Sequence, residues 1–130
     1  LQSHLRKLVN SGKPVLVVGD FNIIPTEMDV YKPESWVQDA LFLPEVRQAF
    51  HDLLQDGWVD AFRTLNPTEK VYTFYDYFRN AYQRNAGLRI DHFLLNPSLA
   101  PLLTGADVDH NVRGWEKSSD HCPVWASFAI

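Results

Sequence analysis

The sequence contains a single cysteine, Cys122, among 130 residues. One cysteine can form neither an internal disulfide nor a cysteine-rich zinc site, and its scarcity favours a reducing, cytoplasmic setting. Long apolar runs are also missing: none approaches the roughly 20 residues of a membrane-spanning helix, and no stretch has the pattern of a signal peptide. We therefore expect a chain that makes no contact with a membrane.

An excess of basic residues is lacking as well, because 12 lysines and arginines face 16 acidic residues and leave a net charge of −4. A chain of this sign has no general attraction for nucleic acid, so a polyanionic partner has to be met by a local basic patch or through a metal ion. Phosphate-loop, dinucleotide-binding and serine-nucleophile motifs are absent. With 45% hydrophobic residues and no repeat or linker, the sequence predicts one globular domain without an internal boundary.

Hydrophobic patterning predicts an α/β chain of short elements. Residues 15–18 are four aliphatic residues in a row, too few for a buried helix, so we expect a central strand buried on both faces. A helical stripe occupies residues 1–9, and because it starts at the first residue we expect a piece of a longer protein. The remaining patterns predict an ordered loop at 23–42, a helix at 44–56, strands at 71–77 and 88–95, a short helix at 97–103, and strands at 106–110 and 122–128.

Two polar side chains follow the strand predicted at residues 15–18. Gly19 lets the backbone turn, and Asp20 and Asn22 come next; at i and i+2 of an extended chain they point the same way. The carboxylate can hold a hard cation or a water molecule, and the carboxamide can donate to an anionic oxygen. The alternative is that the two residues only form an Asx turn after a core strand.

Asp91 interrupts the otherwise apolar strand at residues 90–95. A carboxylate in such a place is expensive unless it is paired or hydrogen-bonded. His121, which enters the last predicted strand, is the obvious partner, and an Asp–His pair would fix the tautomer of the imidazole and raise its basicity. A turn cap, or a contact with Arg89 or Arg84, would satisfy Asp91 equally well.

The remaining histidines carry no such pattern. His92 alternates to the strand face opposite Asp91, which favours a structural role over that of a ligand. Three others have no partner pattern and are predicted to lie on the surface: His4, His51 and His110.

The polar stretch at residues 78–87 has the composition of a surface that binds phosphates and stacks on bases. Arginines, asparagines and tyrosines gather in and beside it, among them Tyr77, Arg79, Arg84 and Asn85. Solvated arginine-rich loops are common, so a plain surface loop stays open as the alternative.

Taken together, these stretches resemble the bacterial exonuclease III family of apurinic/apyrimidinic endonucleases, part of the wider endonuclease/exonuclease/phosphatase superfamily. Order and spacing agree along nearly the whole chain. The matching sequence motifs are VGDFN (18–22) with PTE (25–27), GWVDAFR (57–63), YTFYDY (72–77), RN (84–85), GLRIDH (87–92) and SDHCPV (119–124).

The resemblance implies a site and a mechanism. Asp20 would polarise or deprotonate the attacking water, while Asn22 would bind the scissile phosphate and orient that water. Asp120, with Asp20 and Asn22, would hold Mg²⁺ or Mn²⁺. His121, oriented by Asp91, would contact the phosphate and stabilise the charge that develops there. Double-stranded DNA would be contacted through Phe74, Tyr77, Arg79, Arg84, Asn85, Leu88 and Ile90, of which Phe74, Leu88 and Ile90 would line the pocket for an abasic sugar.

The resemblance covers only the second half of the family's fold. Residues 1–130 are therefore expected to be the C-terminal half of a four-layered α/β sandwich, with one mixed sheet flanked by helices. A glutamate metal ligand, an asparagine and a tyrosine of the first half have no counterpart here. We expect a DNA-repair phosphodiesterase as the whole enzyme, and an isolated chain that is inactive and associates with the missing half or with itself. The alternatives are a non-catalytic DNA-binding or assembly fragment, and a phosphodiesterase acting on lipid or inositol phosphates.

Overall fold

Short helices and strands alternate along the computed structural model, which describes residues 2–129. The α-helices are α1 (Gln2–Val9), α2 (Pro44–Gln55) and α3 (Ala61–Leu65). The strands are β1 (Leu16–Asp20), β2 (Val59–Asp60), β3 (Asp91–Leu95), β4 (Leu103–Val108) and β5 (Val124–Phe128). Short 3₁₀ helices are η1 (Glu27–Asp29), η2 (Pro33–Ser35), η3 (Ala100–Leu102) and η4 (His110–Gly114).

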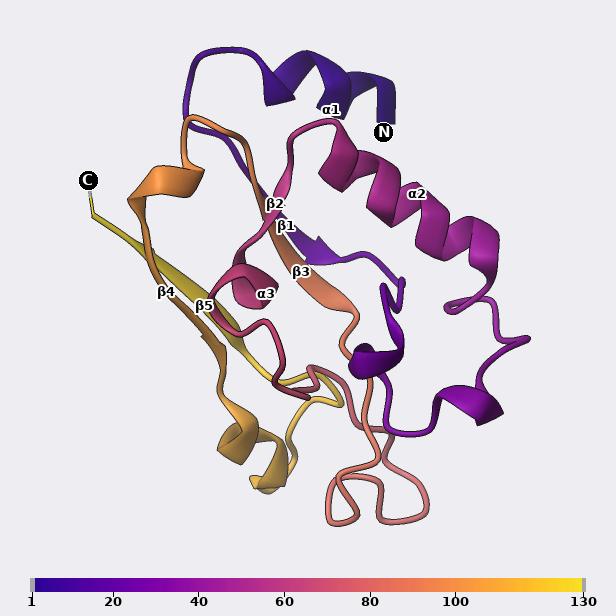
Figure 1. Ribbon diagram of the computed structural model, residues 1–130. Helices are drawn as coiled ribbons and strands as arrows, with labels where there is room; N and C mark the ends of the chain where they lie inside the picture. The colour runs from indigo at the N-terminus through magenta and orange to yellow at the C-terminus, as the bar shows by residue number, and fades with distance from the viewer. Residues whose placement is uncertain (1, 130) are drawn as a thin grey trace.

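The strands form two antiparallel sheets within residues 2–129, one with the order β1-β3-β2 and one made of β4 and β5 (Figure 1). The predicted α/β class is confirmed. The prediction of one mixed sheet is wrong, because β3 takes both of its neighbours antiparallel and β4 pairs with β5 alone. Local patterning marks a strand but does not encode its direction or its partner.

Helices α1 and α2 cover one face of the three-stranded sheet (Figure 1). Pro44 begins α2, where a missing N–H leaves no bond unmade, and Gly57 follows its end with a φ of 117°. Phe50 of α2 and Leu5 of α1 pack in one core cluster with Leu94 of β3. No helix in the described part of the chain is long and apolar enough to cross a bilayer.

Strand β1 is buried on one face only, so the prediction of burial on both faces is wrong. Val17 packs into the cluster under the helices, whereas Leu16 and Val18 are 41% and 51% exposed. Successive side chains of a strand point to opposite faces, and only the face toward α1 and α2 is covered. Leu16 and Val18 thus leave an apolar surface on the outer face of β1.

The strand predicted at residues 71–77 does not form, and the strand predicted at 88–95 begins only at Asp91. The backbone N–H groups of Thr73 and Phe74 both donate to the Leu88 carbonyl, at 2.8 and 2.9 Å, which breaks the regular ladder. Phe74 is left in isolated bridges to Leu88 and His121. The irregularity thus brings Phe74 beside the histidine of the candidate site.

Candidate active site

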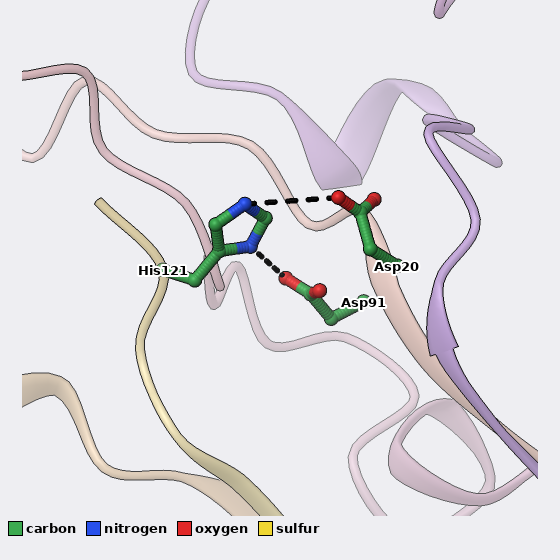
Figure 2. Close-up of side chains that lie close together, drawn as sticks. All are labelled: Asp20, Asp91 and His121. Carbon is green, nitrogen blue, oxygen red and sulfur yellow. Dashed lines mark hydrogen bonds and ion pairs between the residues drawn. The ribbon is translucent and has the colours of Figure 1, made fainter. Parts of the chain in front are cut away.

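Two carboxylates meet one imidazole where β1 ends and β3 begins. Asp20 and Asp91 are register partners across the two strands, so both side chains leave the same edge of the sheet. The Nδ1–H of His121 donates to Asp91 Oδ2 at 2.8 Å, and His121 Nε2 lies 3.7 Å from Asp20 Oδ2 (Figure 2). The predicted pairing of Asp91 with His121 is confirmed.

Backbone contacts hold both members of that pair. The buried Thr73 hydroxyl accepts hydrogen bonds from the N–H groups of Ile90 and Asp91, which anchors the start of β3. His121 bridges to Phe74, and their rings meet edge to face with centroids 5.2 Å apart. The imidazole is therefore fixed by packing on one side and by Asp91 on the other.

The carboxylates around His121 change its pKa. Partial burial lowers the pKa of the imidazole, but the hydrogen bond to Asp91 and the charges of Asp91, Asp20 and Asp120 outweigh that effect and raise it. More of the ring is then positively charged near neutral pH, with a donor at Nε2 as well as at Nδ1. A cationic donor at a sheet edge is suited to an anionic oxygen such as that of a phosphate.

Asp120 joins the site from the residue before His121. Its Oδ1 lies 4.0 Å from His121 Nε2, the same ring nitrogen that Asp20 approaches. One ligand atom each from Asp20, Asp91 and His121 lies within 4.8 Å of the others, a spacing that can hold a metal ion. Because Asp91 and His121 bind each other, Asp20 is the carboxylate of this group that is better suited to a hard cation.

Asn22 lies one turn beyond Asp20. Its backbone has a φ of 51°, and its N–H donates to Asp20 Oδ1 at 2.9 Å. The Asx turn foreseen as the alternative therefore forms. The turn uses only Oδ1 of Asp20, while Asp20 Oδ2 faces His121. The turn and a functional role for Asp20 are therefore compatible.

Four of the residues predicted to contact DNA line one cavity of about 400 Å³: Phe74, Arg79, Arg84 and Leu88. Tyr31 and Trp36, from the loop after Asn22, complete its aromatic wall and were not foreseen. Their only signal was the aromatic content of that loop.

The other three lie outside the lining of this cavity. The Tyr77 hydroxyl donates to the Ser118 carbonyl at 3.0 Å. Asn85 Oδ1 accepts from the Tyr75 hydroxyl at 2.6 Å, and Ile90 is buried in the core.

A buried ionic network behind the site was missed from the sequence. Arg89 Nε and Arg63 Nη2 each donate to Asp29 Oδ1 at 2.6 Å, and Arg89 Nη2 donates to Asp60 Oδ2 at 2.8 Å. Burial alone would raise the pKa of Asp29, but the arginine charges and hydrogen bonds lower it. The network joins η1, which follows Asn22, to the chain just before Asp91. It also excludes the alternative in which Arg89 pairs with Asp91.

Two histidines predicted to lie on the surface are half-buried instead. His51 Nε2 lies 3.1 Å from the Pro25 carbonyl, and the His110 ring packs against that of Tyr75, with centroids 6.5 Å apart. His4 is exposed, as predicted. Neighbours far along the chain cover His51 and His110, which the local pattern does not reveal.

Comparisons with known proteins place this geometry in context. The model of the endonuclease/exonuclease/phosphatase family matches residues 1–121. Exodeoxyribonuclease III of Haemophilus influenzae is 36% identical over 98% of this chain and 51% of its own length. An AP endonuclease from Archaeoglobus fulgidus superimposes with a TM-score of 0.93 at 35% identity, covering 98% of this chain and 50% of that one. The 3′ phosphatase NExo from Neisseria, in a structure bound to a product DNA hairpin, superimposes with a TM-score of 0.92 at 36% identity. The match covers 99% of this chain and 50% of that one.

The chain thus spans about half the length of the proteins it matches. Within that half the likeness covers almost every residue, including the strand ends that carry Asp20 and Asp91 and the segment that carries His121. A family match over residues 1–121 leaves one conclusion: the chain belongs to the endonuclease/exonuclease/phosphatase family.

Proposed function

We propose that residues 1–130 are the second half of an exonuclease III-like DNA phosphodiesterase that acts in base-excision repair. The whole enzyme cleaves DNA on the 5′ side of abasic sites and removes nucleotides from 3′ ends. The arrangement of Asp20, His121 and Asp91 carries this proposal, because it places a carboxylate oxygen beside an imidazole of raised pKa at one sheet edge. The names of the relatives, an exodeoxyribonuclease and an AP endonuclease, support it.

Each residue has a role in the hydrolysis. Asp20 accepts a proton from a water molecule whose oxygen bonds to phosphorus, while the bond from phosphorus to the 3′ oxygen breaks and the departing 3′ oxygen takes up a proton from solvent. His121 donates to a phosphate oxygen and stabilises the charge that accumulates there, and Asp91 keeps its Nδ1–H pointed away from the substrate. Asn22 contributes its carboxamide to the phosphate and to the water.

The donor set suits Mg²⁺ or Mn²⁺ better than a softer metal, because carboxylate oxygens predominate. Asp20, Asp120 and Asn22 would hold the ion. When bound, it supplies Lewis-acid stabilisation of the phosphate oxygens. The two carboxylates are few ligands for Mg²⁺, which keeps its waters and binds weakly to so small a set.

Double-stranded DNA that carries an abasic site is the proposed substrate. Arg79 and Arg84 supply a local basic patch on a chain whose net charge is −4. Phe74 and Leu88 would line the pocket for the flipped-out sugar, whereas Ile90, which is buried in the core cluster of Leu88, would only support that wall. Tyr77 and Asn85 would contribute to the same DNA-binding surface.

The missing half is the proposed partner of the exposed face of β1. Leu16 and Val18 leave that face apolar, and a soluble monomer rarely keeps such a patch bare. Without that half, the chain would associate with a second copy of itself. The single cysteine favours the cytoplasm as the place where the protein acts. Light scattering of the purified chain and of Val18→Lys tests this: a wild-type monomer would contradict it.

A chimera tests the activity. The chain replaces the matching half of the Haemophilus influenzae exodeoxyribonuclease III, and cleavage of an abasic duplex is compared with hydrolysis of a phosphodiester lipid and of an inositol phosphate. We expect cleavage of the DNA alone, with Mg²⁺ required and with loss of activity on chelation. Hydrolysis of the lipid or the inositol phosphate in preference to DNA would overturn the proposal. The isolated chain, assayed beside it, should show little or no cleavage.

A further inference from the structure

His92 is a polar side chain buried among aromatic rings. It follows Asp91 in β3 and points to the opposite face, where it is 1% exposed. The rings of Phe21 and Phe50 pack against it, with centroids 5.5 and 4.9 Å from that of the imidazole. An aliphatic side chain here would bury no polar group. Burying the imidazole costs free energy unless a hydrogen bond compensates for it.

That hydrogen bond goes to a single backbone group. His92 Nε2 lies 3.0 Å from the Ile23 carbonyl, while Nδ1 is buried without a partner among residues 2–129. A carbonyl oxygen only accepts, so Nε2 carries the proton and Nδ1 is the bare nitrogen. Half of the ring's hydrogen-bonding capacity is thus left unused, and the other half is directed at one peptide group.

That peptide group joins Ile23 to Ile24, one residue beyond Asn22. The chain leaves β1 at Asp20 and turns at Asn22, whose φ of 51° lies in the left-handed region. On one side of this turn the Asn22 N–H donates to Asp20 Oδ1. On the other side the Ile23 carbonyl accepts from His92, and the Ile24 N–H donates to the Leu41 carbonyl at 2.9 Å.

We propose that His92 is a positioning residue, which holds the backbone turn that presents Asp20 and Asn22 to the substrate. Two neighbouring residues of β3 then arrange the two sides of the site. Asp91 orients the imidazole of His121 on one face, and His92 fixes the turn at Asn22 from the other. The proposal rests on the proposed function only for the roles it gives to Asp20 and Asn22.

The wild-type chain provides the first test. In nitrogen-15 NMR spectra of the labelled histidines, His92 should be the Nε2–H tautomer, with a proton that exchanges slowly with solvent. Observation of the Nδ1–H tautomer, or of a rapidly exchanging Nε2 proton, would overturn the proposal without any substitution. The readout is independent of DNA cleavage, so its failure cannot be confused with failure of the proposed function.

Three variants separate positioning from packing. His92→Phe keeps a ring but removes the donor, His92→Gln keeps an N–H donor at a similar reach, and Leu94→Val is a matched core change on the same strand. In hydrogen exchange, the amides of Asn22 and Ile24 should open about tenfold faster in His92→Phe than in Leu94→Val. His92→Gln should restore protection.

Equal exchange in His92→Phe and Leu94→Val would mean that the ring only fills space, and the proposal would fall. It would also fall if His92→Gln were no better protected than His92→Phe. Should His92→Phe not fold, the tautomer of the wild-type imidazole and the protection of His92→Gln still decide the question.

Discussion

Asp91 and His121 are separated by 30 positions in the sequence, yet Asp91 Oδ2 and His121 Nδ1 lie 2.8 Å apart. The pair forms because β3 places Asp91 at the sheet edge, and the segment before β5 crosses that edge beside Phe74. Asp20, the register partner of Asp91, approaches the other ring nitrogen at 3.7 Å. One imidazole is therefore enclosed by two carboxylates from adjacent strands.

Replacing Asp91 by asparagine should lower the pKa of His121. Burial favours the neutral ring, and the hydrogen bond and charge of Asp91 are the main influences that raise the pKa against it. An NMR titration of the His121 ring measures the change. Asp76→Asn, which alters an exposed carboxylate, is the control. An unchanged His121 pKa in Asp91→Asn would mean that the pair contributes nothing to the charge of the ring.

The same pair sets the pH dependence of its contribution to stability. The pKa of His121 in the folded chain is raised above its usual value of 6.5. The contribution is therefore fully present below pH 6.5 and is lost as the pH rises through the raised pKa. The difference in unfolding free energy between the wild type and Asp91→Asn should shrink over that range, by a small amount because the ring is partly exposed to solvent.

Asp29→Asn should destabilise the chain by about 3–5 kcal/mol, because it leaves two buried or partly buried arginines short of a carboxylate. Urea unfolding at neutral pH measures the change in unfolding free energy. Glu34→Gln, which alters an exposed carboxylate, is the control and should change little. A loss below about 1 kcal/mol would show that the network is dispensable.

The stability that Asp29 contributes depends on pH. Because the pKa of Asp29 in the folded chain is lowered, this contribution is present above the usual pKa of 3.8 and is lost as the pH falls through the folded pKa.

Arg84→Ala should weaken binding to duplex DNA and reduce the steepness of its salt dependence by about one unit. Arg84 lies on the wall of the aromatic cavity, and its Nε donates to the Arg79 carbonyl at 2.8 Å. Fluorescence anisotropy with an abasic duplex at several salt concentrations measures both effects. The control is Arg6→Ala, on α1 at the opposite end of the molecule from the loop at residues 78–87 (Figure 1). Equal losses in the two variants would argue against a DNA-binding role for this wall.

The sequence predicted the parts of the site that a local anomaly marks. Asp91 stood out as a charge in an apolar strand, and Asp20 as a carboxylate at the end of one, so their meeting with His121 was foreseeable. Asp29 and Arg89 are joined across 60 positions, and nothing near either residue identifies its partner.

Tertiary context also decided the exposure of β1 and the pairing of its neighbours. The aliphatic run predicted that Leu16 and Val18 would be buried, but both are exposed. The sequence does not show that only one face of β1 is covered within this chain. The direction of β3 and the separate pairing of β4 with β5 are likewise set by packing between distant segments. Helix α2 was predictable because Pro44 and Gly57 mark its ends locally.

The central claim, that Asp20 drives phosphodiester hydrolysis, is tested most directly by the chimera with the Haemophilus influenzae enzyme half. Single-turnover cleavage of an abasic duplex is measured for the wild-type chimera and for its Asp20→Asn variant, with DNA affinity measured beside it. We predict that Asp20→Asn slows cleavage by roughly 10²-fold or more while affinity hardly changes, because the carboxylate acts mainly in the transition state. A variant that cleaves at a near-normal rate would contradict the account.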